Sequence, residues 1–142
     1  MKKLMRKISF EKQLTRGQGA FLTFAIGGVG YGLLELLWRG HTHISMVITG
    51  GVCLMIIREV YHRFSKTPLI LRGVISSDMI TAVELVVGCV VNIALGLHVW
   101  DYSGERFDLL GQICPFYSML WFVICVFIML AISAYDRAIA AK

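Results

Sequence analysis

Residues 78–102, with the sequence DMITAVELVVGCVVNIALGLHVWDY, decide how the rest of this chain must be arranged. The stretch is long and apolar enough to cross a bilayer as a helix, which takes about 20 residues. It nevertheless carries Glu84 and Asn92 inside its apolar part. A carboxyl group in the hydrocarbon layer is costly and is normally turned toward protein or water. The stretch therefore predicts a membrane helix with one polar face.

The polar face has a regular spacing. Small and polar residues recur every four positions: Glu84, Gly88, Asn92 and Gly96. On a helix, residues at this spacing form one slowly drifting stripe, and Val, Leu and Ile fill most of the remaining surface. The stretch ends on side chains that suit a water boundary: His98, Trp100, Asp101 and Tyr102.

The composition of the whole chain is that of a membrane protein. Of the 142 residues, 57% are hydrophobic and 16% are charged, whereas soluble domains carry about 25% charged residues. The predicted fold is all-α, a polytopic bundle of four transmembrane helices within residues 20–133. The predicted helices are residues 20–38, 44–61, 74–99 and 113–133. Residues 44–57 give only a short apolar run before Arg58, so a re-entrant segment is the alternative for the second crossing.

The charges predict an orientation. The net charge of +5 does not indicate a nucleic-acid partner, because the basic residues stand at the ends of apolar segments. Twelve of the fourteen Lys and Arg residues lie in three places: a basic arm at residues 1–19, the central link 58–72 and the tail 134–142. The positive-inside rule then places both termini in the cytoplasm. The arm also has apolar residues at helical spacing, as in an amphipathic helix on an anionic leaflet.

An internal repeat is a second hypothesis about the fold. Glu35 and Glu84 occupy similar places in the segments GYGLLELL and MITAVELV, 49 residues apart. Two helices in each unit would make a 2+2 arrangement of parallel repeats.

Glu84 and Asn92 are the leading candidates for an intramembrane site. One interpretation is a proton- or cation-binding site, in which the amide of Asn92 serves either protonation state of the carboxyl. The other is structural, a hydrogen bond across helices. Glu35 and Tyr31 form a second candidate pair, for which a salt bridge from Glu35 to Arg39 is the simpler alternative.

Further candidates gather at the outer boundary. Aromatic and polar residues there would form either an interfacial belt or the lining of a cavity: Trp100, Asp101, Tyr102, Tyr117, Ser118 and Trp121. His41, His43 and His98 are weak candidates for a metal site, because nothing in the sequence brings them together. The four cysteines lie in apolar segments without a CxxC pair and are expected to be buried thiols.

Several enzyme classes lack their motifs in this chain. It has no GxxxxGK[ST] phosphate loop, no GxSxG and no HExxH, so no ATPase, hydrolase or metalloprotease is indicated and no cofactor is expected. An interfacial enzyme would have to rest on His98 and Asp101.

Two runs, ITAVELVVGCVVNIALGLHVWDYS and LLGQICPFYSMLW, resemble the bacterial CmpB-like family of ABC-transporter type IV permeases, and GGVGYGLLELLWRG with ITGGVCLMI fits the same pattern. The resemblance covers residues 27–121. It implies a multi-pass protein of the bacterial inner membrane, with an ATPase subunit as a partner that would dock on residues 58–72. It implies no substrate and no catalytic residues.

The sequence thus favours a small transporter or permease subunit with a polar site at Glu84 and Asn92. Because four helices are few for a transport pathway, a homo-oligomer or a larger membrane complex is expected. The alternative is a non-transporting membrane protein that binds a partner or anionic lipid through its basic cytoplasmic face. An interfacial enzyme is the third hypothesis.

Overall fold

The computed structural model describes residues 2–141, with side chains from residue 17 onward. The helices are α1 (Lys2–Arg39), α2 (Ile44–Arg63), α3 (Leu69–Gly88), its π-helical continuation η1 (Cys89–Ala94) and α4 (Pro115–Ala140). The described residues contain no strand. Four helical stretches are long and apolar enough to cross a membrane: Gly17–Arg39, Ile44–Arg63, Leu69–Ala94 and Pro115–Ala140. The predicted fold class is confirmed, and the chain is a multi-pass membrane protein.

The helix ends differ from the predicted ranges for local reasons. α3 begins at Leu69 rather than at residue 74, because Pro68 starts the helix and its carbonyl oxygen accepts the Arg72 N–H at 3.1 Å. The helical run stops at Ala94 rather than at residue 99, because Gly96 turns the chain at a φ of +63°. Gly96 therefore belongs to a turn and not to the helical stripe.

The other two differences lie at the chain ends. α4 continues past residue 133 to Ala140, through alanines that favour helix. α1 begins at Lys2, so residues 2–19 and the membrane segment form one helix. The predicted amphipathic character of the arm lies mostly outside the described side chains, which begin at residue 17.

The chain divides into two compact units, Met1–Met55 and Ile56–Lys142, with the boundary inside α2. In the first unit, α1 and the first part of α2 pack through glycines. A Cβ atom added at Gly27 would lie 2.6 Å from the Gly50 carbonyl oxygen, and one added at Gly28 would lie 2.8 Å from the Val47 carbonyl oxygen. The small residues let the two backbones approach closely, as in other membrane helix pairs.

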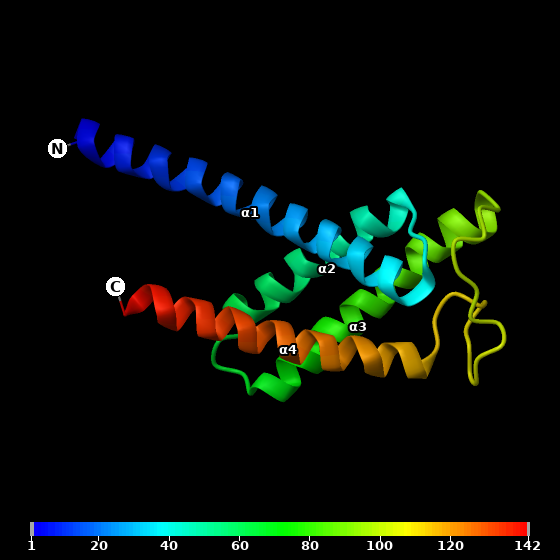
Figure 1. Ribbon diagram of the computed structural model, residues 1–142. Helices are drawn as coiled ribbons and strands as arrows, with labels where there is room; N and C mark the ends of the chain where they lie inside the picture. The colour runs from blue at the N-terminus through cyan, green and yellow to red at the C-terminus, as the bar shows by residue number, and fades with distance from the viewer. Residues whose placement is uncertain (1, 142) are drawn as a thin grey trace. The chain divides into compact units, whose positions relative to one another are not determined.

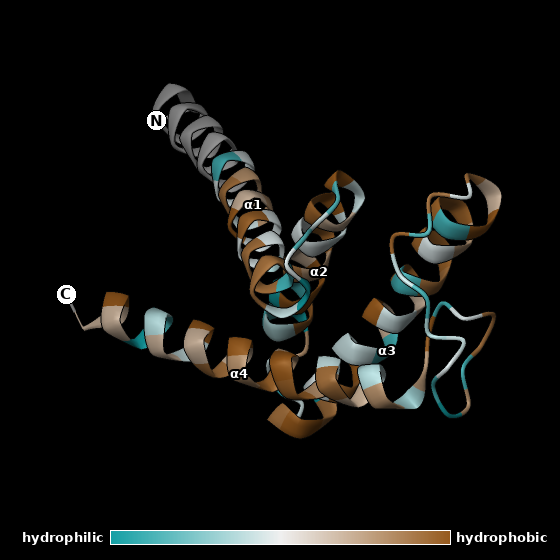
Figure 2. Cartoon of the chain, turned by 45° about the vertical axis from the view of Figure 1, so that its right-hand side comes forward, coloured by the Kyte–Doolittle hydropathy of each residue, from teal (hydrophilic) through white to brown (hydrophobic). Residues whose placement is uncertain are grey.

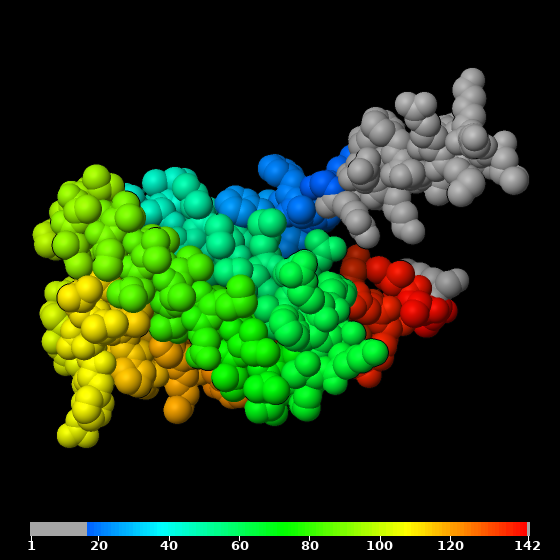
Figure 3. All heavy atoms as spheres, turned by 180° about the vertical axis from the view of Figure 1, so that it is seen from behind, coloured from blue at the N-terminus to red at the C-terminus, as the bar shows by residue number. Residues whose placement is uncertain are grey.

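In the second unit, α3 and α4 run in opposite directions at an angle to each other and are joined by a loop, residues 95–114 (Figure 1). Gly73 of α3 packs against Phe122 and Val126 of α4, where an added Cβ would come within 3.0 Å of both side chains. Apolar residues run along most of α4, whereas hydrophilic residues concentrate in the loop (Figure 2). The loop protrudes from the surface at one end of this unit (Figure 3).

Candidate functional site

Glu84 lies on the buried face of α3. Apart from the adjacent pair Ser76 and Ser77, the buried residues of that helix recur at intervals of three or four: Gly73, Ser76, Ser77, Ile80, Glu84 and Gly88. Residues at this spacing share one side of a helix. The Glu84 side chain is buried in the single chain, with 3% of its surface exposed. Its carboxyl group is therefore covered by protein.

The two oxygens of the Glu84 carboxyl group have different surroundings. Oε1 accepts a hydrogen bond from the Tyr102 hydroxyl group at 3.0 Å. The side chain of Trp121, in α4, also hydrogen-bonds the carboxyl group. Oε2 is buried and has no hydrogen-bond partner among the residues that the structure describes. The carboxyl group is thus enclosed by protein, and Oε2 is an open position, meaning an oxygen without a hydrogen-bond partner among the described residues.

Two aromatic side chains, Tyr102 and Trp121, hydrogen-bond this carboxyl group, and a third stacks on Tyr102. The ring of Tyr102 stacks on that of Tyr117 with a centroid distance of 4.3 Å and an interplanar angle of 10°. Trp121 is buried, with 8% of its surface exposed. One helical turn away on each helix, the Thr81 hydroxyl donates to the Ser118 hydroxyl at 3.0 Å. The site therefore combines α3, the loop and α4.

Asn92 has a different set of partners and anchors the loop. Its Oδ1 accepts the backbone N–H of Val99 at 2.7 Å, and its Nδ2 donates to Oε1 of Gln112 at 2.8 Å. The indole N–H of Trp100 donates to the carbonyl oxygen of Gln112 at 3.1 Å. Asn92, Trp100 and Gln112 are all buried. These bonds hold the two ends of the loop against the end of the helical run.

Gln112 is a residue of this network that sequence reasoning missed. It lies between the loop glycine Gly111 and the start of α4, and only 5% of its surface is exposed. An amide placed just before an apolar helix is the signal that could have identified it. Gln112 and Asn92 complement each other as donor and acceptor.

The loop contains several backbone positions at positive φ. Three non-glycine residues adopt it: His98 at 47°, Phe107 at 59° and Leu110 at 54°. Such positions cost about 1–3 kcal/mol each and persist where the surroundings fix them. The Tyr102 N–H bond to the Gly111 carbonyl oxygen at 2.7 Å and the Gly111 N–H bond to Asp108 at 2.8 Å supply part of that constraint.

Asp101 lies outside the Glu84 site. Its Oδ1 accepts the backbone N–H of Ser103 at 2.9 Å, and this bond holds the pKa of the exposed Asp101 carboxyl group below its usual range. Asp101 shapes the turn and remains charged at neutral pH.

Gly88 is the point on α3 where the loop is seated. A Cβ atom there would lie 2.5 Å from the Gln112 side-chain oxygen and 3.0 Å from the Trp100 ring. We expect Gly88→Val to displace both side chains and to lower the free energy of unfolding by about 1–3 kcal/mol through overpacking. Thermal unfolding of the full chain in detergent measures this loss.

Gly30→Val is the matched control for Gly88→Val. Gly30 is also a helical glycine, but nothing lies within 4 Å of an added Cβ. Equal melting temperatures for the two variants would contradict the role of Gly88 as the seat of the loop.

Glu35 contrasts with Glu84. It is equally buried, at 5% exposure, but both oxygens are used: Oε1 by Arg39 at 3.1 Å and Oε2 by the Thr42 hydroxyl at 2.8 Å. The salt bridge from Glu35 to Arg39, which the sequence offered as the simpler alternative, is therefore present. Glu35 stands four residues before the end of α1, whereas Glu84 stands ten residues before Ala94. The two acids differ in both partners and position along their helices.

The remaining candidates have local contacts. Tyr31 packs over Gly50 within the first unit. His41 contacts Arg39, and Nδ1 of His43 lies 2.8 Å from the Ser45 hydroxyl. No group of three or more His, Cys, Asp or Glu side chains close enough to hold a metal ion occurs in the described part of the chain. The His41, His43 and His98 hypothesis thus gains no support.

Residues 43–141 match the protein family described as "Putative ABC-transporter type IV". The chain belongs to this family. The match includes α2, α3, the loop and α4, and hence every residue of the Glu84 and Asn92 networks. The predicted recognition is confirmed, although the match begins at residue 43 rather than 27 and extends to 141. No curated protein and no solved structure matched the chain.

Proposed function

We propose that this chain is the membrane-spanning subunit of a transporter, with Glu84 at the centre of its substrate- or ion-binding site. The observation that carries the proposal is the buried Glu84 carboxyl group, which has one open oxygen and no salt bridge among the described residues. Ionisable groups inside membrane segments usually serve transport pathways or proton relays. Family membership points in the same direction.

Asn92 has a supporting part in this proposal. Its amide is occupied by Val99 and Gln112, so it fixes the loop that carries Tyr102 to the carboxyl group. Glu84 then forms the polar site with Tyr102, Tyr117 and Trp121, while Asn92 determines where the loop lies. Trp100 and Ser118 act in the same supporting way, through Gln112 and Thr81.

An ATPase subunit would supply the energy, because this chain has no phosphate loop. Its docking surface would be the basic link between α2 and α3. There the guanidinium group of Arg72 donates to the Tyr61 carbonyl oxygen at 3.1 Å and lies 5.0 Å from the centre of the Tyr61 ring, which orders the link. The side chains of Arg63 and Lys66 are exposed for contact. This link would face the cytoplasm of a bacterium, with both termini on the same side of the inner membrane.

The test compares Glu84→Gln with Glu35→Gln in a strain that lacks the chromosomal copy. Untargeted profiling of small molecules inside and outside the cells defines what changes when the protein is absent. We expect Glu84→Gln, at normal membrane abundance, to reproduce the deletion profile, and Glu35→Gln to restore the wild-type profile. Restoration of that profile by Glu84→Gln would contradict the proposal.

The exposed charges of the basic link favour a second candidate function. In it, the chain is a non-transporting membrane protein that binds a partner or anionic lipid. Arg63 is 72% exposed at its side chain despite its ion pair with Glu59. Under this alternative, Arg63→Glu with Lys66→Glu would reproduce the deletion profile and Glu84→Gln would not. The same experiment therefore separates the two functions.

A further inference from the structure

The Glu84 carboxyl group is incomplete in either protonation state. When it is ionised, it is a buried charge without an ion pair among the described residues, and when it is protonated at Oε2, its hydroxyl group has no acceptor among them. A buried polar atom left without a partner costs free energy. A ligand that supplies positive charge at Oε2 would remove this cost.

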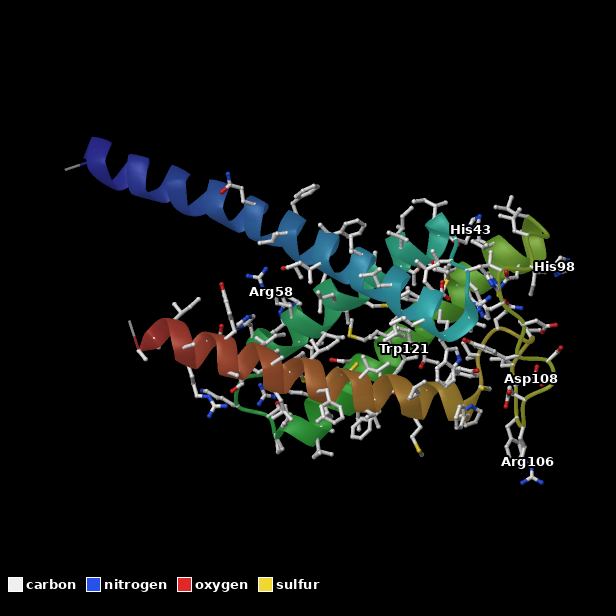
Figure 4. The ribbon with its side chains drawn as sticks, viewed as in Figure 1. His43, Arg58, His98, Arg106, Asp108 and Trp121 are labelled. Carbon is white, nitrogen blue, oxygen red and sulfur yellow. The ribbon has the colours of Figure 1, made fainter. Side chains whose placement is uncertain are left out.

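The segment that carries Glu84 and its aromatic partners is almost free of Lys and Arg residues. Arg106 is the only Lys or Arg in residues 73–136. It is exposed on the loop, lies 6.0 Å from the centre of the Phe107 ring and points away from the helices (Figure 4). Glu35, by contrast, has Arg39 at 3.1 Å. The chain therefore supplies a salt bridge to one buried acid and leaves the other open.

The surroundings of Glu84 suit an organic cation. Tyr102 and Trp121 hydrogen-bond the carboxyl group, and the ring of Tyr117 stacks on that of Tyr102. Aromatic faces attract ammonium groups, and desolvation strengthens that attraction. A hard metal cation would need about six or more oxygen ligands, whereas the hydroxyl group that hydrogen-bonds the Glu84 carboxyl group among the described residues is that of Tyr102.

We infer that the Glu84 site binds a monovalent organic ammonium ion, with the carboxylate as its counter-ion and Tyr102, Tyr117 and Trp121 as its aromatic walls. This inference rests on the proposed function and names the class of substrate. The ammonium group takes the open position at Oε2.

Benzyltrimethylammonium is the probe for the test, and neopentylbenzene is its neutral carbon isostere. The full-length protein, in nanodiscs of phosphatidylcholine, is titrated with each compound while tryptophan fluorescence and heat are recorded. We expect saturable binding of the cation with one site per chain, and no saturable binding of the neutral isostere. Sodium ions at the same concentration should not displace the cation.

The variants assign the binding to this site. Glu84→Gln should weaken binding at least tenfold, and Trp121→Leu should weaken it about 3- to 30-fold, the range that a cation–π contact supplies. Glu84→Asp, which keeps the charge, should retain measurable binding, and Glu35→Gln should bind as the wild type does. Circular dichroism of each variant verifies folding, and Trp121→Leu tests the site if Glu84→Gln does not fold.

Three results would overturn the inference: no saturable binding by the wild type, equal binding of neopentylbenzene, or unchanged affinity in both Glu84→Gln and Trp121→Leu. If the inference fails while Glu84→Gln still reproduces the deletion profile, only the substrate class is wrong. If Glu84→Gln restores the wild-type profile, the transport function itself is wrong.

Discussion

Asn92→Leu is expected to release the loop between α3 and α4 and to destabilise the protein. The substitution removes the acceptor of the Val99 N–H and the donor to Gln112, and both partners are buried or nearly so. Each buried group left unpaired costs about 1–3 kcal/mol. The leucine has the same branched shape but is larger, so the loss comes from hydrogen bonding and overpacking rather than from a cavity.

Two measurements check the effect of Asn92→Leu. Denaturation of the full chain in detergent gives the loss in the free energy of unfolding, and hydrogen exchange at the Val99 amide reports loop opening directly. Ile93→Leu is the control, because Ile93 is the next residue and is 55% exposed. Unchanged exchange at Val99 in Asn92→Leu would show that the loop is held by other contacts.

The double variant Glu84→Leu with Tyr102→Phe is expected to separate stability from function. It replaces both partners of one buried hydrogen bond by apolar groups, which is nearly neutral or stabilising. The phenylalanine keeps a ring for stacking on Tyr117. Because the bond from Trp121 to the carboxyl group is also lost, we expect a protein that is at most about 1–3 kcal/mol less stable than the wild type and that gives the deletion profile in cells.

The structural interpretation of Glu84 gives the opposite expectation for this double variant. If the acid served to hold α3 against the loop and α4, its removal would lower the melting temperature measured in detergent. Glu84→Leu alone is the companion variant, because it leaves the Tyr102 hydroxyl without this acceptor and should be less stable than the double variant. A melting temperature well below that of the wild type in the double variant would favour the structural interpretation.

The sequence was sufficient to predict the four helices, because a helix that crosses a bilayer needs about 20 mostly apolar residues and four such runs can be read directly. The spacing of Glu84, Gly88 and Asn92 also predicted a shared face, and all three residues are buried. The four-residue repeat did not extend to Gly96. That glycine adopts a positive φ, which apolar periodicity does not encode.

The pairing of the site residues could not be predicted from the sequence. Glu84 and Asn92 share a helix face, yet Glu84 contacts Tyr102 and Asn92 contacts Val99 and Gln112. These partners depend on how a loop of 20 residues, 95–114, folds back, including three non-glycine residues at positive φ. The partner of Glu35, by contrast, was predictable. Arg39 stands four residues later on the same helix, and helix geometry alone brings the two side chains together.

The central claim, that Glu84 is a buried acid without an ion pair among the described residues, is tested most directly by carbodiimide labelling in membranes. Dicyclohexylcarbodiimide enters the apolar layer and forms a stable adduct with carboxyl groups that carry a proton and have no cationic partner. Mass spectrometry of the digested protein then locates the adduct. We predict labelling at Glu84, little or none at Glu35, and loss of the Glu84 adduct when benzyltrimethylammonium is present. Labelling of Glu35 in preference to Glu84 would contradict the account.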